Sequence, residues 1–146
     1  MRGYFGIVVK NLKTPANLGT LLRSAYNFEA AFIGIIGERY KHQPSDTLKA
    51  HRHIPLFHYG TDEEFSKSIP FSCQLIGIEI TEASKPLERF VHPQRAVYLL
   101  GPEDGSLPEK LLAKCQSILK INTSQCLNVA VAGSIVMYDR QQKETK

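Results

Sequence analysis

Two polar residues near the start of the chain, Asn17 and Arg23, are six positions apart in a segment whose leucines recur at helical spacing. Six residues make a little under two helical turns, so both side chains lie within about 120° of each other around the axis. An arginine beside the apolar stripe could bind a phosphate through two parallel hydrogen bonds. It could equally cap the helix or pair with a carboxylate, and the spacing alone leaves both interpretations open.

Residues 100–108, with the sequence Leu-Gly-Pro-Glu-Asp-Gly-Ser-Leu-Pro, could form a ligand-binding turn. Gly101 and Gly105 carry no Cβ, which lets the backbone approach a ligand closely. The segment follows the apolar run Arg95–Leu100, and ligands of parallel α/β sheets bind beyond the carboxyl ends of the strands. An ordinary turn between a strand and a helix has a similar composition, so both interpretations stay open here too.

A third candidate segment joins Ile121 to the small-residue run 129–134. Asn128 precedes that run, where a helix is expected to begin, and Cys126 lies two residues earlier. Small side chains allow a helix to pack closely against its neighbours. The pattern suits an ordinary buried helix as well as a helix beside a ligand.

Basic residues are concentrated in the first part of the chain. Residues 1–60 contain eight Lys and Arg against three Asp and Glu, a net charge of +5, whereas residues 61–146 have a net charge of −1. Such a surface attracts a polyanion such as a nucleic acid, although a solvated loop has the same composition. The densest basic region contains Arg39, Lys41, Lys49 and Arg52.

The bulk composition is that of a globular protein. The 146 residues, 42% hydrophobic and 22% charged, suit one domain, 1–146, without a separate RNA-binding domain. No apolar stretch approaches the roughly 20 residues of a membrane span, and no signal peptide is expected. Cys73, Cys115 and Cys126 have neither paired nor metal-like spacing, which predicts reduced thiols, a cytoplasmic location and no metal site.

Apolar runs and helical periodicities alternate along the chain, which predicts an α/β fold with a mostly parallel sheet flanked by helices. A Rossmann-like or flavodoxin-like strand order would fit this alternation equally well. The expected strands are Tyr4–Val9, Ala31–Ile36, Ile54–His58, Leu75–Ile80, Arg95–Leu100 and Ile118–Ile121. Helical segments are expected at residues 14–28, 45–50, 62–67, 86–90, 109–115 and 128–141.

Together and in this order, the three motifs resemble those of the SpoU/TrmH family of RNA ribose 2′-O-methyltransferases, part of the SPOUT superfamily. The resemblance extends from about Ile7 to Tyr138. It implies an α/β-knot fold, in which the C-terminal segment threads a loop to form a deep trefoil knot. It also implies S-adenosylmethionine as the cofactor, RNA as the substrate and a homodimer whose subunits share each active site. The short chain resembles stand-alone members that act on tRNA, with ribosomal RNA as the alternative.

The resemblance assigns roles to individual residues of this chain. Catalytic roles are implied for Arg23, Asn17, Glu103, Asn128 and Cys126. The residues expected to bind the cofactor, largely through backbone groups, are Leu100, Gly101, Glu103, Gly105, Ile121, Thr123, Cys126, Leu127 and Ala130. The expected RNA contacts, taken from the basic region together with the motif arginine, are Arg23, Arg39, Lys41, Lys49 and Arg52.

Arg23 matches the family's arginine that activates the ribose 2′-hydroxyl. A guanidinium stays protonated in proteins, so a role as a base would need strong desolvation. An equally economical role is electrostatic, in which Arg23 holds an RNA phosphate and stabilises the attacking oxygen.

Two residues depart from the family pattern. Ser106 occupies a position usually given to glycine, and Cys126 replaces the usual serine. A thiol is a poorer hydrogen-bond partner than a hydroxyl. A catalytically impaired, knotted RNA-binding protein is therefore an alternative to the active enzyme, and an unrelated α/β nucleotide-binding domain is a third hypothesis.

Overall fold

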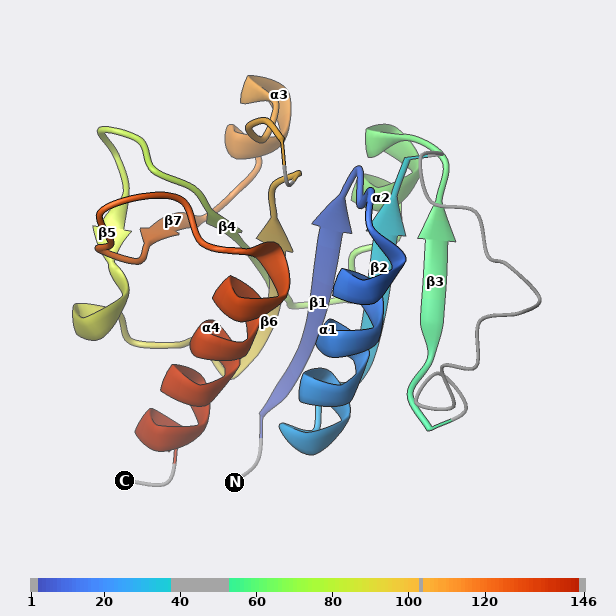
Figure 1. Cartoon of the computed structure of the whole chain (residues 1–146), viewed down its shortest axis with the longest axis horizontal. Coiled ribbons are helices and arrows are strands. Elements are labelled where there is room, and N and C mark those ends of the chain that lie inside the picture. Colours follow the sequence, from blue (N-terminus) through green and yellow to red (C-terminus); the bar gives the residue numbers. More distant parts are fainter. Residues whose placement is uncertain (1–2, 38–52, 103, 145–146) are drawn as a thin grey trace.

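Seven strands form one parallel sheet in the computed structural model, which describes residues 3–37, 53–102 and 104–144. The strand order is β3-β2-β1-β6-β4-β7-β5, and every described pair of neighbours is parallel (Figure 1). The expected α/β fold with a parallel sheet is confirmed. The strands are β1 (Tyr4–Lys10), β2 (Phe32–Ile36), β3 (Leu56–Tyr59), β4 (Gln74–Ile78), β5 (Lys85–Pro86), β6 (Arg95–Leu100) and β7 (Ser117–Lys120).

The position of β6 excludes both strand orders that the sequence left open. Tyr98 of β6 lies opposite Ile7 of β1 on one side and opposite Ile76 of β4 on the other. In a Rossmann-like sheet the fourth strand pairs with the first, and in a flavodoxin-like sheet the third strand does. Here β6 separates β1 from β4, which brings the ends of β4, β6 and β7 together.

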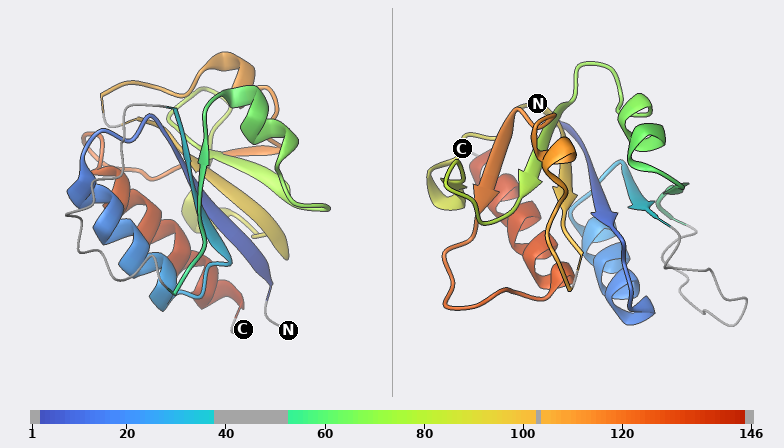
Figure 2. Two further views of the ribbon diagram at one scale, coloured as in Figure 1. Left: turned by 90° about the vertical axis from the view of Figure 1, so that its right-hand side faces the viewer. Right: turned by 90° about the horizontal axis from the view of Figure 1, so that it is seen from above.

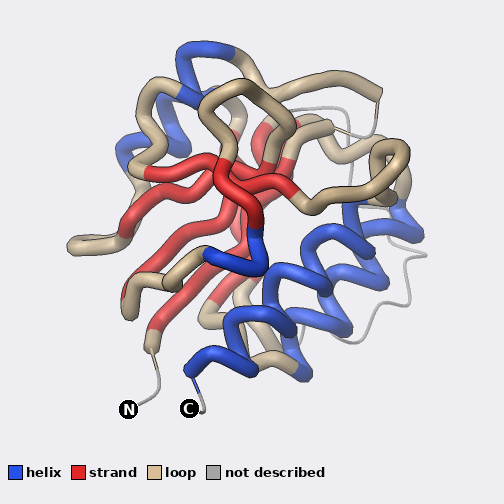
Figure 3. Tube along the Cα trace, turned by 90° about the vertical axis from the view of Figure 1, so that its left-hand side faces the viewer, coloured by secondary structure: helices blue, strands red, loops and turns tan. Residues whose placement is uncertain are grey.

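Helices cover both faces of the sheet. α1 and α4 lie side by side on one face (Figure 3). α2 and α3 pack on the opposite face, where Phe65 and Leu111 join the core, and Figure 2 shows the sheet between α2 and the α1–α4 pair. The helices are α1 (Pro15–Asn27), α2 (Asp62–Lys67), α3 (Glu109–Leu112) and α4 (Val129–Glu144), with a short 3-10 helix, η2 (Leu87–Arg89).

The central strands are apolar on both faces because both faces are covered. In β6, Ala96, Tyr98 and Leu100 belong to the core under α1 and α4, whereas Val97 and Leu99 belong to the core under α2 and α3. Successive residues of a strand point to opposite sides, so a strand between two helical layers needs an unbroken apolar run. This is why the sequence predicted β6 with the correct bounds.

The small residues of α4 allow close contact with α1 and with the end of β6. A Cβ atom at Gly133 would lie 2.7 Å from Leu21 Cδ1 and 3.1 Å from Leu100 Cδ1. The two helices also meet through hydroxyls, with Ser134 Oγ 2.7 Å from Ser24 Oγ. The predicted close packing of the small-residue run is therefore confirmed, and it fixes the helix that carries Arg23 against the helix that follows Asn128.

The structure departs from the predicted elements at several points. β4 ends at Ile78, β3 begins at Leu56, and the two-residue strand β5 was not predicted because Pro86 leaves no apolar alternation to detect. The helix expected at residues 45–50 lies outside the described residues. The trefoil knot stays a prediction. None of the described helices combines the length and apolar character that a membrane crossing requires.

Candidate functional site

A cavity of about 320 Å³ opens at the carboxyl ends of β4, β6 and β7. Parallel α/β sheets bind ligands at this edge. Residues of the segment 121–128, which leads from β7 to the start of α4 in Figure 1, form part of the wall. The volume lies at the lower end of the range for small-molecule sites.

Most residues predicted to bind a cofactor line this cavity. Ala130 is an exception, because it is fully buried and its backbone N–H donates to Asn128 Oδ1. Glu103, also predicted, lies outside the described residues. The predicted residues that line the cavity come from the second and third motifs and are Leu100, Gly101, Gly105, Ile121, Thr123, Cys126 and Leu127.

The wall formed by the end of β4 and the residues that follow it was not predicted from the sequence. Ile78, Glu79 and Ile80 line the cavity because β4 lies between β6 and β7 in the sheet. No local motif marks these residues, and only the strand order places them here. The remaining lining residues were not predicted individually, although all except Lys120 lie in the second and third candidate segments: Pro102, Asp104, Lys120, Val129 and Ala132.

A hydrogen bond between two asparagines joins the first and third motifs. Asn128 Nδ2 donates to Asn17 Oδ1 over 2.8 Å. Asn128 Oδ1 also accepts from the backbone N–H groups of Ala130 and Val131, at 2.9 and 3.2 Å, and so caps the start of α4. The predicted residues Asn17 and Asn128 are thus brought together, directly beside the cavity residues Leu127 and Val129.

Arg23 lies on α1 but does not line this cavity. Its side chain is exposed and forms no hydrogen bond or ion pair with the residues that the structure describes. Its backbone oxygen accepts from Asn27 Nδ2 over 2.9 Å, an ordinary contact within a helix.

Cys126 presents an exposed thiol at the cavity. The turn before it is held by Thr123 Oγ1, which donates to the carbonyl oxygen of Gln125 over 2.7 Å. The predicted RNA contacts other than Arg23 lie outside the described residues: Arg39, Lys41, Lys49 and Arg52. Within residues 3–37, 53–102 and 104–144, no group of three His, Cys, Asp or Glu side chains could hold a metal ion.

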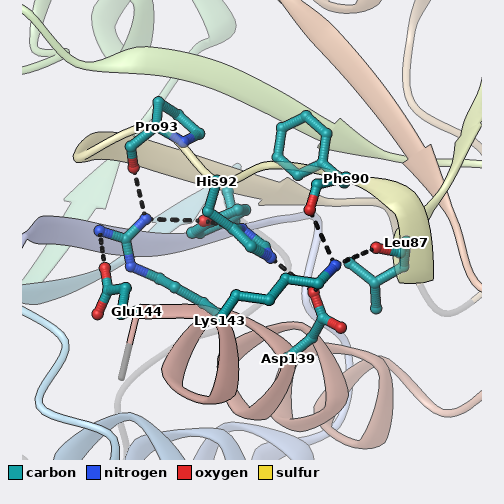
Figure 4. Close-up of polar contacts among 9 residues, drawn as sticks. Leu87, Phe90, His92, Pro93, Asp139, Lys143 and Glu144 are labelled. Carbon is teal, nitrogen blue, oxygen red and sulfur yellow. Dashed lines mark hydrogen bonds and ion pairs between the residues drawn. The ribbon is translucent and has the colours of Figure 1, made fainter. Parts of the chain in front are cut away.

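A second cluster of titratable groups lies at the other end of α4 (Figure 4). Arg140 Nη1 donates to the hydroxyl oxygen of Tyr98 over 3.0 Å, so the Tyr98 proton points to His92 Nδ1, 2.6 Å away. His92 Nε2 then carries the imidazole proton and donates to Asp139 Oδ2 over 2.7 Å. Burial lowers the pKa of His92 and raises that of Tyr98 to about 12, so both groups are neutral at pH 7.

The same cluster attaches the last turns of α4 to the segment before β6. Lys143 Nζ donates to the carbonyl oxygens of Leu87 and Phe90 at 2.7 and 2.9 Å, and Arg140 Nη1 donates to that of Pro93 at 2.8 Å (Figure 4). Arg140 is 1% exposed. The side chain of His92 is 2% exposed, and these contacts fix the helix to the segment before β6.

A model of the SpoU rRNA methylase family matches residues 4–138, which include all three motifs. The chain belongs to the SpoU rRNA methylase family. This membership rules out the unrelated α/β nucleotide-binding domain considered from the sequence.

Named relatives of this SpoU family member include a mouse enzyme. The chain is 26% identical over 153 residues to the tRNA (guanosine(18)-2′-O)-methyltransferase TARBP1 of Mus musculus, an alignment that covers 93% of this chain and 9% of that protein. The AdoMet-bound rRNA methyltransferase from Sinorhizobium meliloti superposes with a TM-score of 0.84 at 21% identity, covering 97% of this chain and 57% of that one. For the SpoU methyltransferase AviRb from Streptomyces viridochromogenes, in complex with AdoMet, the TM-score is 0.87 at 17% identity, with coverages of 100% and 60%. The chain therefore spans 9% of the mouse protein and less than two thirds of either solved chain.

Proposed function

We propose that this SpoU family member transfers a methyl group from S-adenosylmethionine to a ribose 2′-hydroxyl of RNA. The observation that carries the proposal is the cavity at the ends of β4, β6 and β7, which seven of the residues predicted to bind the cofactor line. The structural relatives from Sinorhizobium meliloti and Streptomyces viridochromogenes were solved with AdoMet bound.

The residues of the cavity fit this cofactor. Ile78, Leu100 and Ile121 offer apolar surface to a flat adenine ring, and Gly101 and Gly105 leave the backbone open to polar groups of the ligand. When bound, S-adenosylmethionine would supply a methyl group on a positively charged sulfur. The ribose oxygen would gain this methyl group and lose its proton while the carbon–sulfur bond breaks and S-adenosylhomocysteine leaves. The protein's own groups position the two reactants, and this positioning is a large part of the rate gain in such a reaction.

Arg23 acts on the RNA side of the reaction in this proposal. It holds a phosphate next to the target ribose and stabilises negative charge on the attacking oxygen. Arg23 does not line the cavity of its own chain. In this proposal it reaches the methyl group bound in the cavity of a second copy. The proposed active unit is therefore a homodimer, in which Arg23 of one protomer meets the cavity of its partner.

The proposed substrate is tRNA, with ribosomal RNA as the alternative. The mouse relative is named as a tRNA 2′-O-methyltransferase, whereas the Sinorhizobium meliloti relative is an rRNA methyltransferase. Arg39, Lys41, Lys49 and Arg52 are the proposed backbone contacts, which would make RNA affinity fall steeply with salt. The proposed location is the cytoplasm.

One observation supports a second candidate function. Cys126 places a thiol at the cavity where the family motif has a serine, so a hydroxyl that could organise the catalytic arginine is missing. An RNA-binding protein of this family without methyl transfer would tolerate this change. Such a protein would bind RNA and leave every ribose unmodified.

Nucleoside mass spectrometry of cellular RNA tests the proposed reaction. Cells that lack this protein are expected to lose one ribose 2′-O-methylation, and the wild-type chain is expected to restore it. The Arg23→Ala chain, expressed at the same level, is expected not to restore it. An unchanged set of ribose methylations in the deleted cells would contradict the proposal and favour the second candidate.

A further inference from the structure

Glu79 is the carboxylate that reaches from one wall of the cavity to the other. It follows β4, lines the cavity and is half-buried. Its Oε2 accepts from the backbone N–H of Leu107 over 3.0 Å, and its Oε1 accepts from the N–H of Ile80 over 3.2 Å. Leu107 closes the loop that begins at Gly101, so this carboxylate connects the end of β4 with the far end of the motif loop.

We propose that Glu79 is a positioning residue for cofactor binding, whose carboxylate holds loop 101–107 in the conformation that lines the cavity. The inference rests on the proposed function, because it names a group that prepares the same cavity for S-adenosylmethionine. A hydrogen bond from a backbone N–H to a carboxylate is stronger than one between neutral groups. A loop that is already ordered loses less entropy when a ligand binds.

The backbone of Glu79 is itself fixed on two sides. Its N–H donates to the carbonyl oxygen of Leu119 in β7 over 2.9 Å. Its carbonyl oxygen accepts from Ser84 Oγ over 2.6 Å. The carboxylate therefore projects from a rigid support. The described residues between Gly101 and Leu107 form no strand or helix, and the loop takes its position from this carboxylate.

Gly101 makes room for this contact. A Cβ atom at this position would lie 3.3 Å from Glu79 Oε2 and 3.5 Å from Leu107 Cγ. The first glycine of the motif thus permits the carboxylate to pass across the start of the loop and reach its end. Leu107, 4% exposed, anchors the far end in the core under α2 and α3.

Calorimetry with two ligands, S-adenosylhomocysteine and S-adenosylmethionine, tests the role of Glu79. Glu79→Ala is expected to weaken binding of both ligands by at least about tenfold. The backbone N–H of Leu107 loses its acceptor, and the loop loses the carboxylate that supports it. Glu79→Gln keeps an oxygen for Leu107 N–H and is expected to stay within about threefold of wild type. Glu82→Ala is the matched control, because Glu82 is an exposed glutamate of the same connection that does not line the cavity.

The use of two ligands and of Glu79→Gln distinguishes a positioning role of Glu79 from a direct contact with the ligand. Equal binding by Glu79→Ala and wild type overturns the inference. So does a loss in Glu79→Gln as large as that in Glu79→Ala. A loss confined to S-adenosylmethionine, whose sulfur is charged, overturns it as well, because Glu79 would then act on the ligand directly. If the wild-type chain binds neither ligand, the proposed function itself is refuted. If the wild-type chain binds both ligands and Glu79→Ala binds them equally well, only the role of Glu79 is refuted.

Discussion

The side chain of Asn128 links the start of α4 with α1 through hydrogen bonds. Its amide oxygen accepts from the backbone of Ala130 and Val131, and its amide nitrogen donates to Asn17, 111 positions earlier. The cap fixes the orientation of the amide, because only the oxygen can accept from the backbone N–H groups. The first helix is therefore held in a defined place relative to the cavity by the residue that starts the last helix.

Arg23 is expected to be essential for methyl transfer and dispensable for cofactor binding. Arg23→Ala should slow the reaction by at least on the order of a hundredfold, or about 3 kcal/mol, because it removes a contact made mainly in the transition state. Arg23→Lys should also fail, since a point charge cannot replace the two-point grip of a guanidinium on a phosphate. The measurement is the rate at which a tritiated methyl group is transferred from S-adenosylmethionine to RNA.

Arg89, an exposed arginine that does not line the cavity, provides the control for Arg23. Arg89→Ala is expected to react at the wild-type rate. Calorimetry should give the Arg23 variants the wild-type affinity for S-adenosylhomocysteine. If Arg23→Ala methylates RNA as fast as the parent chain, Arg23 has no catalytic role.

At the scale of elements, α4 is fixed at both ends by different means. Asn128 caps its start beside the cavity, and the cluster around His92 attaches its last turns to the segment before β6. A neutral His92 is part of that attachment, because its Nδ1 accepts from Tyr98 and its Nε2 donates to Asp139. Protonation of Nδ1 would leave the Tyr98 hydroxyl proton without an acceptor.

His92 therefore makes the stability of the fold depend on pH. Burial lowers the pKa of folded His92 below its ordinary value of 6.5. As the pH falls below 6.5, the unfolded chain binds a proton that the folded chain does not, so the free energy of unfolding decreases until the folded histidine protonates too. The melting temperature is expected to fall from pH 7 to pH 5, and to fall less in His92→Gln, whose amide offers the same acceptor and donor. Parallel curves for the two chains would contradict this role of His92.

Strands β6 and β4 show which features of this fold can be predicted from the sequence. Local patterns predict the bounds of a strand but not its neighbours in the sheet. The run 95–100 gave the bounds of β6, because a strand covered on both faces needs apolar residues throughout. The order of strands depends on contacts between residues far apart in the chain, which local patterns do not record. For that reason Gly101 and Ile121 were predicted as site residues from their motifs, whereas Glu79 was found only when β4 was placed between β6 and β7.

For the whole molecule, the exposed side of α4 supports the proposed homodimer. Val131 and Tyr138 on this helix are 44% and 55% exposed, and the Tyr138 ring lies 6.4 Å from that of Phe28 on the same outer face. A symmetric dimer would bury such a face against its own copy. Light scattering at micromolar concentration is expected to give about twice the chain mass of 16.4 kDa. A mass of one chain would refute the dimer and the shared active site with it.

The central claim is that S-adenosylmethionine occupies the cavity beside Cys126, and alkylation of this thiol tests it most directly. Cys126 is exposed at the cavity, whereas burial raises the pKa of Cys73 and, to about 11, that of Cys115, which makes both less reactive. In EDTA, S-adenosylhomocysteine at ten times its Kd is expected to slow alkylation of Cys126 by iodoacetamide about tenfold, and to leave Cys73 and Cys115 unaffected. Peptide mass spectrometry gives each rate. An unchanged rate at Cys126 with millimolar ligand would contradict the account.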